Sequence, residues 1–194
     1  MSLNISLQTI SAVLLLDNEG SRLYANYYQT QSPKEAKTTH TPEVNFQTVS
    51  QQLKFESSVF SKINKAHQDV LLFDNHLITY KQSNDIILII VAKINENESL
   101  VFSLVSNLFE SLNILLDNTI DKSTVLKKYD MVSLAIDETI DDGIIIEIEP
   151  AIIVSRVTNP PNPNATHGIE INEKSFYSAL SFATKLGERL QQGL

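Results

Sequence analysis

Two short stretches of almost purely aliphatic sequence constrain the fold of this chain more than any other feature. Residues Val13–Leu16 are continuously apolar, and residues 86–92 read IILIIVA. A strand with one face in water alternates apolar and polar side chains, whereas a strand buried on both faces is apolar throughout. Neither stretch approaches the roughly 20 apolar residues of a membrane-spanning helix. We therefore expect a fold built around strands that are covered on both sides.

Composition limits the class of protein. The 194 residues suffice for one domain with a single core, and the mean hydropathy of −0.06 is that of an ordinary globular protein. The net charge of −8, with Lys127–Lys128 as the densest basic spot, argues against nucleic-acid binding. The absence of cysteine excludes disulfides and thiolate zinc sites. No signal peptide and no transmembrane segment is evident, so we expect a cytoplasmic protein.

The first half of the chain predicts a hairpin, a loop, a helix and three strands. Residues 10–28 read as two strands around a turn at Asp17–Gly20, and the second strand places Tyr24 and Tyr28 on its polar face. Residues 29–45 are polar and contain two prolines, which predicts an exposed loop. Strands are predicted at 69–73, 76–81 and 85–93. A helix between the loop and these strands, ending at about residue 65, is predicted from an apolar stripe of Phe46, Val49, Leu53, Phe60 and Ile63.

A long apolar helix is predicted next. Asn95 and Glu98 have the spacing of a capping box at its start. Phe102, Phe109 and Ile114 fall outside the main apolar stripe, so the helix is apolar over more than half of its circumference. Such a helix is covered on a second side, by another helix or by another protein.

A second helix is predicted from near Asp121, with Thr119 or Asp121 as its N-cap, to a left-handed stop at Gly143. Its end is strongly acidic, and carboxylates there oppose the helix dipole by about 0.3–1 kcal/mol each. This acidic end is either a solvated turn or a surface made for a partner. The carboxylates concerned are Asp137, Glu138, Asp141 and Asp142.

The rest of the chain divides into three parts. Residues 143–149 are strand-like, and the pattern of residues 151–157 fits either a helix or an edge segment. Residues 158–171 hold three prolines and predict a linker. Residues 172–194 carry a narrow apolar stripe, which predicts a C-terminal amphipathic helix. The main domain is thus expected to span residues 1–157.

This order of elements predicts an α/β (α+β) sandwich around one mainly antiparallel sheet of about five strands. Longin and SNARE-like folds, profilin-like domains and, loosely, PAS-type sensory domains share this order. The order alone does not choose among them.

No arrangement of residues predicts catalytic, cofactor-binding or metal-binding chemistry. The five glycines are too scattered for a phosphate-binding loop, and the four histidines share no ligand spacing. Asp137 and Asp141 lie four residues apart, but the sequence after them lacks the alternating acidic ligands of a calcium loop. We therefore expect no enzyme and no cofactor.

Four stretches together resemble the zeta subunits of the COPI coatomer, which belong to the adaptor-complex small chains. They are residues 12–28 (AVLLLDNEGSRLYANYY), 73–81 (FDNHLITYK), 95–109 (NENESLVFSLVSNLF) and 129–147 (YDMVSLAIDETIDDGIIIE). The last is the most specific, and the closing residues 187–194 resemble fungal zeta subunits in particular.

The resemblance implies a longin-type fold and a structural, non-catalytic role. It implies pairing with the helical-solenoid trunk of the gamma coat subunit, within a seven-subunit coatomer that an Arf-family GTPase recruits to Golgi membranes. The implied role is retrograde transport from the Golgi to the endoplasmic reticulum and within the Golgi, peripheral on Golgi membranes and COPI vesicles. As partner contacts we predict the apolar side chains Tyr24, Tyr28, Phe102 and Phe109 and the carboxylates Asp141 and Asp142.

Two alternatives stay open at this point. One is a longin-type module for tethering or GTPase regulation, although no long heptad region or membrane anchor follows residue 157. The other is a PAS-like sensor of a small molecule, which requires an internal pocket with convergent polar groups.

Overall fold

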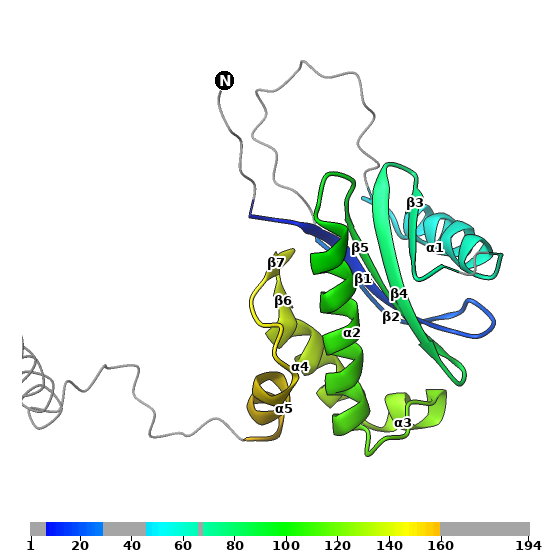
Figure 1. Cartoon of the computed structure of the whole chain (residues 1–194). Helices are drawn as coiled ribbons and strands as arrows, with labels where there is room; N and C mark the ends of the chain where they lie inside the picture. The colour runs from blue at the N-terminus through cyan, green and yellow to red at the C-terminus, as the bar shows by residue number, and fades with distance from the viewer. Residues whose placement is uncertain (1–6, 29–45, 66–67, 160–194) are drawn as a thin grey trace, which may run out of the picture. The chain divides into compact units, whose positions relative to one another are not determined.

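The computed structural model describes residues 7–28, 46–65 and 68–159. Its centre is a five-stranded sheet in the order β2-β1-β5-β4-β3, in which every neighbouring pair is antiparallel (Figure 1). This confirms the predicted sheet. The strands are β1 (Ile10–Asp17), β2 (Arg22–Tyr27), β3 (Val70–Phe73), β4 (His76–Ser83) and β5 (Ile86–Lys93).

The two aliphatic stretches form the central strands β1 and β5, and both faces of these strands are buried. Along β5, Leu88 and Ile90 belong to one hydrophobic cluster, whereas Ile87 and Ile89 belong to a second cluster on the opposite face. Side chains alternate between the faces of a strand, so an uninterrupted aliphatic sequence supplies two cores at once. This is why neither strand shows a polar alternation.

Helices cover both faces of the sheet (Figure 1). Helix α1 (Val49–Ile63) packs on one face through Phe55, Val59 and Ile63. The other face carries α2 (Glu98–Leu115), α4 (Tyr129–Thr139) and α5 (Pro150–Thr158), whose buried side chains share one cluster with β1 and β5. The predicted sandwich is therefore confirmed, and 151–157 is a helix.

The orientation of α1 differs from the predicted stripe. Val49 and Leu53, which we assigned to the apolar face, are 62% and 48% exposed, whereas Phe55 and Val59 are buried. The capping box of Thr48 and Gln51 fixes where the helix begins. Glu56 interrupts the apolar pattern because it is buried as an ion pair with Arg22. A buried carboxylate cannot be recognised from hydropathy, and this explains the error.

Helix α2 begins two residues later than predicted. Its N-cap is Asn97, whose side chain accepts hydrogen bonds from the backbone N–H groups of Ser99 (2.9 Å) and Leu100 (3.3 Å). Asn95 therefore caps no helix, and Glu98 is the first helical residue. The second side of α2 is covered within the chain, because α4 and α5 pack against it.

The predicted single helix from Asp121 to Gly143 is wrong. Asp121 is the N-cap of a short helix, α3 (Lys122–Lys127), and α4 starts afresh at Tyr129 because Lys128 leaves the helical conformation at φ −112° and ψ 35°. Helix α4 ends at Thr139, whose carbonyl accepts hydrogen bonds from the N–H groups of Ile146 and Glu147.

A small hairpin follows α4 in place of the expected strand over 143–149. It pairs β6 (Ile140–Asp141) with β7 (Ile144–Ile145), and Asp142 and Gly143 form its turn at φ 45° and 76°. The left-handed conformation predicted for Gly143 is thus present, but it closes a hairpin and not a helix. Asp141 and Asp142 consequently lie beyond the helix end.

Some predictions fall on residues that the structure does not describe. These are the loop 29–45, the linker from residue 160 to 171 and the helix 172–194. At the described end, α5 extends through Thr158, one residue into the predicted linker.

Candidate protein-interaction site

Strand β2 lies beside α4, and this brings several of the predicted contact residues together. The ring of Tyr24 packs on that of Tyr129, with centroids 6.2 Å apart. Burial, reinforced by the charge of Asp137, raises the pKa of the Tyr24 hydroxyl. Only 8% of Tyr24 is exposed. Its ring therefore packs beneath the exposed ring of Tyr129 and contributes little surface of its own.

Tyr28 connects the end of β2 to the acidic segment. Its hydroxyl donates a hydrogen bond to the carbonyl of Ile140 at 3.3 Å. Burial raises the pKa of Tyr28, and the nearby Tyr24, Asp137 and Asp141 raise it further. The structure therefore places Tyr24, Tyr28 and Asp141 in one region.

The carboxylates at the end of α4 repel each other. Burial raises the pKa of Asp137, and the charges of Asp141 and Glu138 add to that rise. Glu138 is compensated by Arg156, at 3.3 Å. Among the described residues, no ion pair involves Asp137, Asp141 or Asp142.

The turn at Asp142 and Gly143 is bound to the beginning of β1. The carbonyl of Gly143 accepts hydrogen bonds from the N–H groups of Thr9 (2.9 Å) and Ile10 (3.0 Å), and the side chain of Gln8 donates to the carbonyl of Asp142 at 2.9 Å. The backbone of this turn thus helps to hold the β6–β7 hairpin on β1. The side chains of Asp141 and Asp142 are exposed.

Phe102 and Phe109 belong to a different element, α2. Phe102 is half-buried under the ammonium of Lys81, which lies 4.5 Å from the ring centroid. Phe109 is half-buried against the core cluster beneath α2. Contact with a partner stays a prediction for all six residues.

The sequence interpretation missed two exposed apolar side chains of α4, Tyr129 (41% exposed) and Leu134 (42%). The sequence did carry a signal for the exposure of Tyr129. Tyr129, Ser133 and Asp137 recur at four-residue spacing, so they lie together on α4 beside its buried stripe. The buried stripe consists of Val132, Ala135, Ile136 and Thr139.

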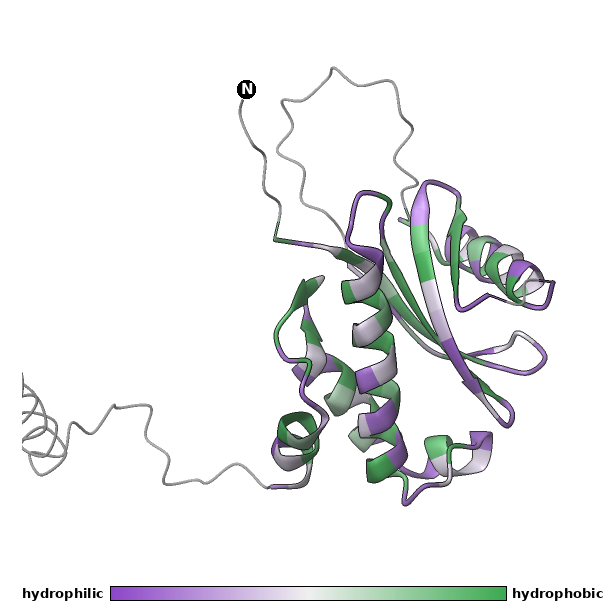
Figure 2. Cartoon of the chain, viewed as in Figure 1, coloured by the Kyte–Doolittle hydropathy of each residue, from purple (hydrophilic) through white to green (hydrophobic). Residues whose placement is uncertain are grey.

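A second group of exposed apolar side chains lies on the segment after β7 and on the first turn of α5. Ile146, Ile148 and Ile152 are 52%, 40% and 42% exposed. Hydropathy colouring shows this hydrophobic stretch over β7 and the segment that leads to α5 (Figure 2). The carbonyl of Ile148 accepts a hydrogen bond from Asn107 of α2 at 3.0 Å, which holds the segment on the helical layer.

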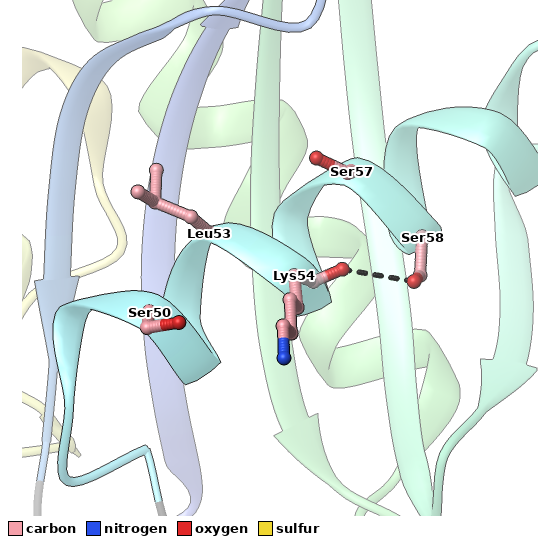
Figure 3. Close-up of a pocket in the computed structure, with 5 residues that line it drawn as sticks. All are labelled: Ser50, Leu53, Lys54, Ser57 and Ser58. Carbon is pink, nitrogen blue, oxygen red and sulfur yellow. Dashed lines mark hydrogen bonds between the residues drawn. The ribbon is translucent and has the colours of Figure 1, made fainter.

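The outer side of α1 carries an open hollow lined by Ser50, Leu53, Lys54, Ser57 and Ser58. All five side chains come from one helix, and the only hydrogen bond drawn among them runs from the Ser58 hydroxyl to the Lys54 carbonyl at 2.8 Å (Figure 3). They do not form an internal pocket with convergent polar groups, so this hollow gives the small-molecule sensor no support.

Among the residues that the structure describes, no group of three or more His, Cys, Asp or Glu side chains is arranged to hold a metal ion. No helix there is both long and apolar enough to cross a membrane.

The antiparallel five-stranded sheet between helices agrees with the longin-type fold that the resemblance in the sequence implies. The profile of the family described as "Clathrin adaptor complex small chain" matches residues 9–162. The chain therefore belongs to this family.

Within the family, the similar proteins are coatomer zeta subunits, which confirms the resemblance seen in the sequence. Coatomer subunit zeta of Saccharomyces cerevisiae is 40% identical over 192 residues, covering 98% of this chain and 99% of the yeast protein. Coatomer subunit zeta-1 of Oryza sativa subsp. japonica is 31% identical over 186 residues, covering 92% and 93%. Human coatomer subunit zeta-2 is 35% identical over 152 residues, covering 78% and 66%.

A chain in a structure titled "Homology model of the full-length AP-3 complex in a stretched open conformation" has a similar fold. The TM-score is 0.55 at 16% sequence identity, and the match covers 91% of this chain and 98% of that one. This likeness shows the shared fold alone.

Proposed function

We propose that this chain is a non-catalytic structural subunit of the COPI vesicle coat, paired permanently with the trunk of the gamma coat subunit. The observation that carries the proposal is the 40% identity to the yeast zeta subunit, which extends over nearly the full length of both proteins. The coat containing it would be a heteroheptamer, recruited from the cytoplasm to Golgi membranes through an Arf-family GTPase. It would serve retrograde and intra-Golgi transport.

The exposed surfaces are consistent with a chain that functions inside a complex. The isoleucines at 146, 148 and 152 and the apolar side chains of α4 are exposed in the isolated chain. Permanent complexes bury apolar side chains of this kind in interfaces larger than about 2,000 Å². We therefore expect an interface of that size.

Co-expression of this chain with the helical trunk of a gamma coat subunit tests the pairing. Size-exclusion chromatography with light scattering should show a one-to-one complex that survives about 0.15 M salt. The trunk of an adaptor large chain from a different coat is the matched control and should not co-elute. A monomer that ignores the gamma trunk would contradict the proposal.

A further inference from the structure

The outward side of α4 forms a continuous surface of mixed apolar and acidic character, which we name the α4 face. Helical spacing places its members on an arc that begins beside the buried stripe and runs round to the opposite side of α4, and Asp141 of β6 extends it beyond the helix end. All are exposed except Ser133, which is half-buried. The α4 face consists of Tyr129, Asp130, Ser133, Leu134, Asp137 and Asp141.

The charge of the α4 face is uncompensated within the described chain. Helix α4 contains no lysine or arginine, and no ion pair among the described residues involves Asp130, Asp137 or Asp141. Glu138, at the border of the face, differs because it forms an ion pair with Arg156, which also pairs with Glu147. Asp137 also lies in the last turn of α4, where a negative charge opposes the helix dipole. The described part of the chain therefore retains an unfavourable arrangement of carboxylates, which a cation bound beside them would relieve.

We propose that the α4 face is the surface that docks a helix of the large subunit whose exposed side carries Lys or Arg beside aliphatic residues. This rests on the function proposed above. The carboxylates would pair with the basic groups, and Tyr129 and Leu134 would supply apolar contact around them. A second copy of this chain fits less well, because a two-fold contact would set the acidic face against itself.

The double variant Asp137→Asn/Asp141→Asn removes the charge and keeps the size of both side chains. As an isolated chain it should unfold at the same or a slightly higher temperature than the wild type, because the repulsion is gone. Its complex with the gamma trunk should be at least tenfold weaker at low salt, with a shallower dependence of Kd on salt concentration. Leu134→Ser, an exposed position, tests the apolar part independently and should also weaken binding.

The matched control is Glu19→Gln/Glu96→Gln, which removes two charges far from α4 in sequence and should leave Kd within about twofold. If the wild type and both α4 variants bind the gamma trunk with equal affinity, the α4 face is not the docking surface, while the proposed function still stands. Absence of any complex with the wild-type chain would overturn both. A homodimer of the isolated chain that the double variant dissociates would assign the face to self-association and overturn the proposal.

Discussion

Gly143 occupies a backbone position that combines two demands, a left-handed conformation and close contact with another strand. Its φ is 76°, and a Cβ added there would lie 2.5 Å from the carbonyl oxygen of Ile10. Gly20 provides a comparison, because its φ is 82° but its added Cβ would meet the side-chain ring of Phe60 at 2.7 Å. A side chain can move aside, whereas the carbonyl of β1 is held by the sheet.

The substitution Gly143→Ala should lower the free energy of unfolding by about 2–3 kcal/mol, through the strained φ and the clash with β1. Gly20→Ala carries the same conformational strain and should cost clearly less. Urea denaturation followed by circular dichroism measures both. Equal losses of unfolding free energy in the two variants would show that the clash with β1 costs nothing beyond the strain of the left-handed φ.

Between elements, a buried ion pair connects β2 with α1. The guanidinium of Arg22 binds both oxygens of Glu56, with Nε 2.9 Å from Oε2, and the hydroxyl of Tyr27 donates to Glu56 at 2.7 Å. Glu56 is only 2% exposed. A bidentate pair of this kind fixes the position of α1 on the sheet, but its desolvation cost offsets much of its attraction.

Removing one member of this pair should therefore be worse than removing both. Arg22→Leu leaves a buried carboxylate without its cation and should destabilise the chain by about 3 kcal/mol or more. The double variant Arg22→Leu/Glu56→Leu should recover most of that loss, because no buried charge remains. Unfolding free energies of the two single variants and the double variant form the required cycle. Additive losses would contradict the argument.

Some of these elements could be predicted from the sequence and others could not. The central strands were predictable because burial on both faces leaves an uninterrupted aliphatic signature, and the turn Asp74-Asn75 takes the left-handed conformation that its residues favour. The break at Lys128 was not predictable, since no glycine or proline marks it. The rotation of α1 was missed because Glu56 is buried by a partner that is distant in sequence. Of the α4 face, Asp141 was predicted and Asp137 recognised, but Tyr129 and Leu134 required the structure.

For the whole molecule, one buried carboxylate adds a polar connection between the sheet and the helical layer, beside the hydrophobic cluster that the two share. Asp17, at the end of β1, is fully buried and accepts hydrogen bonds from the backbone of Ser21 (2.7 Å) and Glu19 (3.0 Å) and from the ammonium of Lys122 in α3 (2.7 Å). The N–H of Lys122 in turn donates to Asp85, at the turn before β5, at 3.0 Å. One short segment thus joins two turns of the sheet to the helices.

This arrangement predicts how the stability of the chain depends on pH. Burial alone would raise the pKa of Asp17, but the ion pair with Lys122 and the two backbone donors outweigh it and hold the pKa below the ordinary value of 3.8. The folded state therefore binds the proton less tightly than the unfolded state. The stabilisation is complete above about pH 4 and is lost as the pH falls through the folded pKa. Asp17→Asn should consequently be less stable than the wild type at pH 7, and the difference should shrink steadily below pH 4. Urea titrations of both proteins at pH 7, 5, 4 and 3 measure this, and a difference that stays constant to pH 3 would show that the charge of Asp17 contributes nothing to the stability of the fold.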